Sequence, residues 1–160
     1  MSNSQIIHGT EMHRNNRNLS SELVKAYRDT DYVVSIGGDE HTLNVTKPLP
    51  TALVELLELK PITGLAVITA YNPYSVKCSD AENKRWQAQL KELLSLHGYE
   101  TLPALGVSSD GKWEEPSLAV LGISHELANA FGSCFRQNAI VYGEPNSTVE
   151  LVICDKDTLR

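Results

Sequence analysis

The apolar run LAVITA at residues 65–70 constrains the fold more strongly than any other feature of the sequence. An apolar run of strand length without alternation indicates a central strand that is covered on both faces. A Ser-Asp-Ala-Glu capping box at residues 79–82 then starts a helix, and the apolar stripe of that helix continues until Gly98. The chain is therefore expected to build a sheet with helices packed on it.

The segments after this helix complete an ordered series of elements. Residues 101–107 and 115–123 are typical of two antiparallel strands, because the Asp-Gly pair between them is a strong turn signal. Ser124 caps a second helix, and a strand at residues 139–142 follows it. Strand, helix, strand, strand, helix and strand is the βαββαβ order of ferredoxin-like sheets, which we predict for the centre of the domain.

Further elements flank this centre on both sides. The patterns predict a short helix after Ser20, a β-hairpin over residues 32–45, a helix over residues 50–59 and an extra C-terminal strand over residues 149–154. Residues 1–18 are polar and Asn-rich without periodicity, which is typical of a flexible N-terminal arm. We therefore predict an α+β fold, with a single domain over residues 19–160.

The predicted hairpin contains SIGGDEH at residues 35–41, one letter away from the GGDEF signature of diguanylate cyclases. His41 replaces the Phe of that signature, and no residue run before Gly37 has the Asp-rich strand that a cyclase uses to bind metal. The interpretation that remains is structural. Two glycines supply positive φ angles in a tight GGDE loop, and the acidic pair keeps the loop solvated.

The overall composition disfavours several classes of partner. The formal net charge is −6 and no Lys/Arg-rich run occurs, so we expect no nucleic-acid binding. The apolar stretches are too short to span a bilayer and the N-terminal residues lack a signal-peptide core, so we expect no membrane contact and a cytoplasmic location. The three cysteines form no CxxC pair and the histidines form no HxxxH pair, so we predict no metal and no other cofactor.

The predicted strand order brings polar residues from four segments to one end of the domain. The first strand ends there, the first helix begins there, and the third and fourth strands begin there. The free N–H groups of a helix N-terminus favour an anion or a carbonyl oxygen. The sequence therefore predicts a small-ligand site at this polar rim, with the candidate binding residues Asn72, Ser75, Asn83, Arg85, Gln137 and Asn138.

The rim also contains the residues that catalysis would need. Glu82 and Glu115 are the candidates for a general acid or base. Arg85 is the candidate for pairing with an anion, and the amides are candidates for orienting the ligand. No histidine falls at this rim, and binding without turnover is as well supported as chemistry. Whether the protein is an enzyme is left open by the sequence.

Aromatic residues near the rim suggest the class of ligand. Trp113, together with Tyr71 and Tyr74, would place aromatic surface at the same end of the domain. Aromatic rings beside amide side chains suit a nucleobase or another planar ligand. We therefore expect a nucleotide-like or phosphorylated small molecule.

Two other interpretations stand beside the ligand site. The rim residues also have structural roles to fill: Asn72 suits a turn, Glu82 suits the capping box, and Gln137 and Asn138 suit the passage from a helix to a strand. The second functional hypothesis is a non-catalytic interaction or regulatory module. In that case an exposed edge strand or the hairpin over residues 32–45 would pair with a partner protein or with a second copy of the chain.

Five motifs resemble the bacterial family called domain of unknown function 3293. The resemblance covers residues Gly64 to Val152 and extends, with the upstream helix and hairpin, over residues 19–154. The family name assigns no reaction, so the resemblance implies a bacterial origin but no activity and no roles for individual residues. The motifs are VITAYNPYS (67–75), SDAENKR (79–85), LHGYETLPALGV (96–107), DGKWEEPSLAVLGIS (110–124) and FRQNAIVYGEP (135–145).

Overall fold

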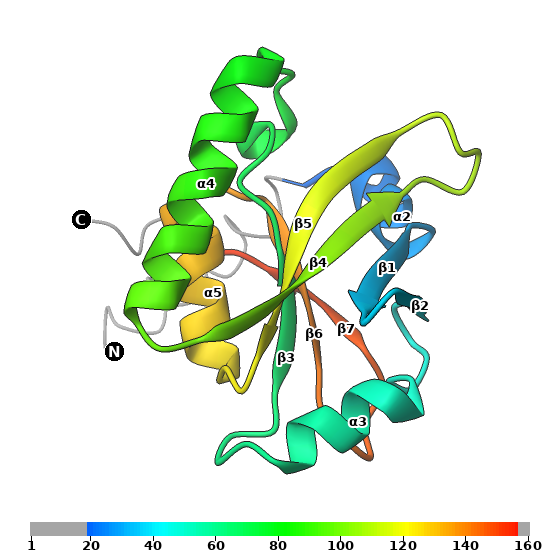
Figure 1. Cartoon of the computed structure of the whole chain (residues 1–160). Helices are drawn as coiled ribbons and strands as arrows, with labels where there is room; N and C mark the ends of the chain where they lie inside the picture. Colours follow the sequence, from blue (N-terminus) through cyan, green and yellow to red (C-terminus); the bar gives the residue numbers. More distant parts are fainter. Residues whose placement is uncertain (1–18, 157–160) are drawn as a thin grey trace, which may run out of the picture.

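A curled antiparallel sheet is the frame of the molecule in the computed structural model, which describes residues 19–156 (Figure 1). Seven strands form it in the described residues: β1 (Asp31–Ile36), β2 (Asp39–Leu43), β3 (Leu65–Ile68), β4 (Glu100–Val107), β5 (Glu114–Leu121), β6 (Ala139–Gly143) and β7 (Glu150–Ile153). Their order across the sheet is β2-β1-β4-β5-β3-β6-β7, and every neighbouring pair is antiparallel. The predicted extra C-terminal strand is present as β7.

Four α-helices and a short 3-10 segment accompany the sheet within residues 19–156: α2 (Ser21–Arg28), α3 (Thr51–Glu58), η1 (Pro73–Ser75), α4 (Asp80–Leu96) and α5 (His125–Cys134). Three of these helices begin after a serine whose hydroxyl accepts a backbone N–H three residues later, at 3.1–3.2 Å: Ser20, Ser79 and Ser124. The predicted mixture of helices and strands is confirmed. In this part of the chain no helix has the length and apolar character needed to cross a membrane.

Strand β3 lies at the centre of two hydrophobic cores. All four of its residues are buried, as the sequence predicted. Leu65 and Val67 point to one face of the sheet, and Ala66 and Ile68 point to the other, because successive side chains of a strand alternate. The sheet therefore separates two layers of packing.

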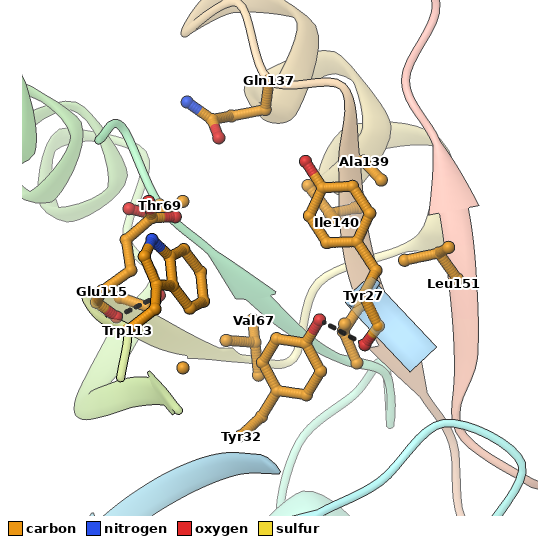
Figure 2. A pocket seen from close by; sticks show the side chains of 13 residues that line it. Tyr27, Tyr32, Val67, Thr69, Trp113, Glu115, Gln137, Ala139, Ile140 and Leu151 are labelled. Carbon is orange, nitrogen blue, oxygen red and sulfur yellow. Dashed lines mark hydrogen bonds between the residues drawn. The ribbon is translucent and has the colours of Figure 1, made fainter. Parts of the chain in front are cut away.

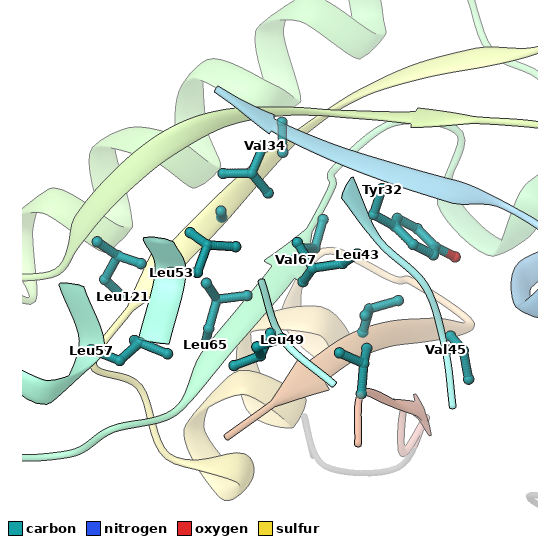
Figure 3. Packing of buried hydrophobic residues seen from close by; sticks show 14 residues of the cluster. Tyr32, Val34, Leu43, Val45, Leu49, Leu53, Leu57, Leu65, Val67 and Leu121 are labelled. Atoms are coloured by element: carbon teal, nitrogen blue, oxygen red, sulfur yellow. The ribbon is translucent and has the colours of Figure 1, made fainter. Parts of the chain in front are cut away.

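Helices α4 and α5 cover the convex face of the sheet, and α3 fills part of the concave face. Leu90 and Leu94 of α4 are fully buried in the convex-side core. Leu53 and Leu57 of α3 are fully buried in the concave-side core, near the end of the sheet that holds Leu65 (Figure 3). One end of the concave face is thereby closed by a helix.

The hairpin between β1 and β2 has a tighter turn than the sequence suggested. Only Gly37 and Gly38 lie in the turn, with φ angles of 56° and 93°. Asp39 and Glu40, which we predicted to belong to the loop, are the first residues of β2 and pair with β1. Two central residues with positive φ match a two-residue hairpin turn, which twists in the same sense as the strands.

The curl of the sheet brings its two outer strands together. The segment after β2 meets the segment before β7: the Thr46 N–H donates to the Val149 carbonyl at 2.7 Å, and the Val149 N–H donates to the Lys47 carbonyl at 2.8 Å. An isolated β-bridge joins Pro48 and Thr148 beside them. The sheet is thus closed on the side of its edge strands by a short bridge. The predicted N-terminal arm, residues 1–18, lies outside the described residues.

Candidate functional site

A hollow opens on the concave face of the sheet, at the end away from α3 (Figure 2). Its apolar floor comes from β3, β6 and β7 and consists of Val67, Ala139, Val141 and Leu151; Ile140 also borders the hollow, although its side chain packs into the core on the other face of the sheet. Three aromatic rings and four polar side chains stand around that floor: Tyr27, Tyr32, Trp113, Thr69, Glu115, Ser117 and Gln137. An apolar pocket with a few polar groups is the usual form of a small-molecule site.

Glu115 is placed in the hollow by the alternation of β5. Ser117, Ala119 and Leu121 follow it on the same face of the strand, and all three are buried. The carboxyl group thus stands at the end of a buried row. Opposite it on β4 is Gly106, which has no side chain to fill the space.

Burial changes the acid strength of Glu115. Removal from water raises the pKa of its carboxyl group to about 7, and one hydrogen bond from Asn72 Nδ2 to Glu115 Oε2, at 3.3 Å, opposes that rise. No Lys, Arg or His lines the hollow. A carboxyl group with such a pKa exchanges its proton near neutral pH.

Aromatic rings form the walls of the hollow. Figure 2 shows Trp113 beside Glu115 on one side and Tyr27 and Tyr32 on the other. The tyrosine hydroxyls have partners: Tyr32 Oη donates to the Tyr27 carbonyl at 3.0 Å, and Tyr27 Oη lies 3.2 Å from Ser75 Oγ. Trp113 is 40% exposed, so its ring borders both the hollow and the solvent.

The size of the hollow limits what enters it. Its empty volume is about 410 Å³ when the open mouth is included, and its inner cavity measures only about 30 Å³. The inner part therefore has room for a few small atoms or the edge of a ring. A larger ligand would place most of its atoms at the mouth.

The first rim cluster joins the end of β3 to the start of α4. Asn83 Oδ1 accepts the Asn72 backbone N–H at 2.9 Å, and Asn83 Nδ2 donates to Asn72 Oδ1 at 2.9 Å. Asn72 Oδ1 also accepts the Cys78 N–H at 3.0 Å, and Asn72 Nδ2 reaches Glu115. The structure thus brings Asn72, Asn83 and Glu115 together as the sequence indicated, but both the oxygen and the nitrogen of the buried Asn83 amide bond to Asn72.

The second rim cluster joins η1 to the start of β6 and to α2. Asn138 Nδ2 donates to Ser75 Oγ at 2.9 Å, and Tyr27 Oη contacts the same hydroxyl. Gln137 Nε2 donates to the carbonyls of Tyr71 and Phe135, at 3.2 Å each. Both amides are buried, and their hydrogen bonds fix the loop between β3 and α4.

Two predicted residues remain apart from these clusters. Arg85 is exposed on α4 and does not line the hollow. Glu82 lies in the first turn of α4, where its backbone N–H donates to the Ser79 hydroxyl, and its side chain does not line the hollow either. Of the two candidate acids, Glu115 alone is in the hollow.

The aromatic residues differ from those the sequence suggested. Trp113 lines the hollow, whereas Tyr71 and Tyr74 do not. The opposite wall is built by Tyr27 and Tyr32, which come from α2 and β1. The alternation of β3 and β5 would have identified Thr69 and Ser117 as lining residues, but no local pattern places the two tyrosines there.

The loop at the rim has an unusual backbone. Asn72, Tyr74, Ser75 and Arg136 have φ angles of 46°, 54°, 62° and 57°, in the left-handed region that residues other than glycine seldom adopt. The Tyr74 N–H donates to the Arg136 carbonyl at 2.7 Å, which ties two of these residues together. Such conformations are kept only where surrounding contacts hold them, and they cluster at functional sites.

A second hollow lies at the opposite end of β6 and is lined mainly by polar residues. Its side chains already pair with one another: His125 Nε2 lies 3.1 Å from Glu150 Oε1, and Tyr142 Oη lies 3.0 Å from Glu144 Oε1. Across residues 19–156, no group of three or more His, Cys, Asp or Glu side chains is arranged to hold a metal ion. The hollow at Glu115 is therefore the candidate site.

The fold and this hollow define a mixed α/β domain whose curled antiparallel sheet carries a small, aromatic-walled acidic pocket at one end. Residues 68–140 match the family described as "Protein of unknown function (DUF3293)", which confirms the resemblance that the motifs indicated. The match includes Trp113, Glu115 and Gln137 but not Tyr27 or Tyr32. No curated protein and no solved structure gave a match.

Proposed function

We propose that the protein binds a small planar molecule in the hollow, with Glu115 as its polar anchor and Trp113 as the surface on which it stacks. The observation that carries this proposal is the placement of one carboxyl group, without a charged partner, at the end of the buried row formed by Ser117, Ala119 and Leu121. Burying such a group costs free energy, and strongly perturbed acids concentrate at functional sites.

The shape of the hollow supports a planar ligand of limited size. Trp113 and the two tyrosines offer ring surfaces on opposite walls, and planar groups stack on such surfaces. The narrow inner volume accommodates the edge of a ring, while the open mouth accommodates substituents. A ring the size of a nucleobase suits this space better than a complete nucleotide.

The charge of the hollow argues against a phosphate at its centre. No cationic side chain lines it, and its one carboxyl group is that of Glu115, which would repel a phosphate when ionised. Arg85, the residue predicted to pair with an anion, stands on the exposed side of α4. A phosphorylated ligand would therefore have to keep its phosphate outside the hollow.

Glu115 also gives the proposed site a means of proton transfer. With a pKa of about 7 it carries a proton on roughly half of the molecules at neutral pH, so it can donate or accept one. No second carboxyl group and no Lys or His lines the hollow, and burial raises the pKa of the lining residues Tyr27 and Tyr32 above the usual tyrosine value. We therefore place binding first, and Glu115 as the candidate for any catalysis that accompanies it.

The decisive experiment is a fragment screen followed by the two tryptophan indole N–H signals in ¹⁵N-edited NMR spectra. Trp113 borders the hollow, whereas Trp86 packs on the other face of the sheet. We expect planar fragments to shift the Trp113 signal and to leave the Trp86 signal in place. Gly106→Leu would fill the hollow from β4 and abolish those shifts, because Gly106 stands beside Trp113.

The matched control is Gly111→Asn in the β4–β5 turn, where φ is 71° and no atom lies near the position of a Cβ. It changes a glycine of the same hairpin without touching the hollow. Fragments that bind equally well to the Gly106→Leu protein would contradict the proposal. So would a set of hits that all shift residues of the β1–β2 hairpin instead, since those would favour the interaction module.

We also infer that the centre of the domain is ferredoxin-like, which the strand order β4-β5-β3-β6 and the helices α4 and α5 support. We infer a cytoplasmic location, which the three unpaired cysteines support. A protein partner or self-association through β2 remains the alternative; the exposed Asp39 and Glu40 on that edge disfavour strand addition.

A further inference from the structure

We infer that the ligand of the hollow is a small organic cation, an ammonium or a protonated ring nitrogen carried on a compact planar body. This inference rests on the proposed function and names the chemical class of its ligand. It is carried by two observations: the hollow contains one acidic group and no basic one, and three aromatic side chains, Tyr27, Tyr32 and Trp113, line its walls.

The charges around Glu115 favour a cation. Every Lys, Arg and His of the described chain is absent from the lining, so the carboxylate has no charge partner of its own. Asn72 Nδ2, at 3.3 Å, is its one hydrogen-bond donor. A carboxylate ion can accept several hydrogen bonds, so one oxygen keeps its capacity for the N–H groups of a ligand. Charge-assisted bonds of this kind are stronger than neutral ones.

The aromatic walls favour the same charge. The hydroxyl groups of Tyr27 and Tyr32 already have partners in the protein, Ser75 Oγ and the Tyr27 carbonyl, so what these residues mainly offer to a ligand is ring surface. Trp113 stands beside the carboxyl group (Figure 2). The face of an aromatic ring is electron-rich and attracts cations, most strongly for Trp, and an anion gains nothing from it.

Binding of such a cation would be linked to the release of a proton. Near neutral pH Glu115 is partly protonated, because burial raises its pKa. A bound ammonium ion pairs with the carboxylate form, so the carboxyl proton leaves to solvent as the complex forms. The other titratable groups that interact with this carboxylate are Tyr27 of α2 and Tyr32 of β1. Burial raises the pKa of both above the usual tyrosine value, so they stay neutral throughout.

The test uses three probes that share one ring and differ in charge: benzylamine, benzyl alcohol and benzoate. We expect benzylamine to bind at least about tenfold more tightly than the other two, measured by the shift of the Trp113 indole signal at pH 8. Its dissociation constant should rise by up to about tenfold per pH unit below pH 7, as Glu115 takes up its proton. Glu115→Gln should remove both the preference for the amine and its dependence on pH.

The matched control is Glu114→Gln, the exposed neighbour on the opposite face of β5, which should retain both properties. Equal or tighter binding of benzyl alcohol or benzoate would overturn the cationic ligand while leaving the hollow as a binding site. Amine binding that is the same in the Glu115→Gln and wild-type proteins would also overturn it. If none of the three probes shifts Trp113, the proposed function fails together with this inference.

Discussion

Asn72 and Asn83 hold each other through two hydrogen bonds of 2.9 Å, one from the backbone N–H of Asn72 and one from the side-chain amide of Asn83. Asn83 is 5% exposed, so water does not replace either bond if one partner is lost. This pair fixes the end of β3 to the first turn of α4. It also presents the Asn72 amide to Glu115, and so connects the structure of the loop to the candidate site.

Asn83→Ala should therefore destabilise the fold. The substitution leaves the Asn72 N–H without its acceptor in a half-buried place, and we expect the free energy of unfolding to fall by about 2 kcal/mol. Urea unfolding followed by circular dichroism measures the change. Arg85→Ala, two residues further along the same helix on an exposed position, should change it by less than about 0.5 kcal/mol. Equal effects of the two substitutions would mean that the pair has no structural role.

The stability of the protein should depend on pH through Glu115. Its folded-state pKa of about 7 lies above the value of 4.5 expected for an unfolded chain. Between these two pH values the folded state holds a proton that the unfolded state has released. The contribution of this proton to the free energy of unfolding is therefore complete below pH 4.5 and is lost as the pH rises through 7. Between pH 5 and pH 8 the free energy of unfolding of the wild-type protein should therefore fall by about 2 kcal/mol more than that of the Glu115→Gln protein.

Denaturant melts of both proteins at pH 5, 6, 7 and 8 measure this difference. The glutamine variant keeps the shape of the side chain and an acceptor for Asn72, so its own dependence on pH reports the remaining groups. Parallel curves for the two proteins would show that Glu115 has the same pKa in the folded and unfolded states.

Gly132 of α5 allows the helix to approach β6 and the residues after β7. A Cβ at this position would lie 2.6 Å from Cys154 Sγ and 2.7 Å from Ile140 Cγ2, which is too close for any side chain. Gly132→Ala should lower the free energy of unfolding by about 1–3 kcal/mol through overpacking. Adding Cys154→Ala removes one of the two clashes and should recover part of the loss. A double-mutant cycle measures that coupling, and strict additivity of the two substitutions would rule out the contact.

The two glycines of the β1–β2 turn should respond differently to substitution. Gly37, with φ of 56°, is in the left-handed region that Asn tolerates, so Gly37→Asn should leave the melting temperature nearly unchanged. Gly38 has a φ of 93°, at which a β-branched residue is strained, so Gly38→Val should lower the free energy of unfolding by about 1 kcal/mol. Thermal melts of the two variants give the comparison. A protein that tolerates Gly38→Val as well as Gly37→Asn would not have the two-residue turn described above.

Much of the fold could be predicted from local patterns. The serine caps, the continuous apolar strand and the Asp-Gly turn are signals that act within a few residues, and each marks an element that the structure contains. The edge strand β2 was harder to recognise. Asp39 and Glu40 are typical of a loop, but on an exposed strand edge acidic side chains remain in water, and the backbone still pairs with β1.

The candidate site could be predicted in part. Strand order alone brought Asn72, Asn83 and Glu115 together, because chain direction decides which strand ends share one side of a sheet. The walls made by Tyr27 and Tyr32 could not be predicted, since they depend on how far the sheet curls around α3. The use of the Asn83 amide could not be predicted either, because a buried amide and a ligand-facing amide look alike in a sequence.

The bridge between Thr46 and Val149 has a consequence for the order of folding. It joins residues from opposite ends of the described chain, so it pays a large loop-closure entropy and forms only after most of the sheet is in place. During synthesis the N-terminal hairpin emerges from the ribosome long before its closing partner does. Leu151 of β7, which forms part of the floor of the hollow, therefore takes its place only once β7 has left the exit tunnel.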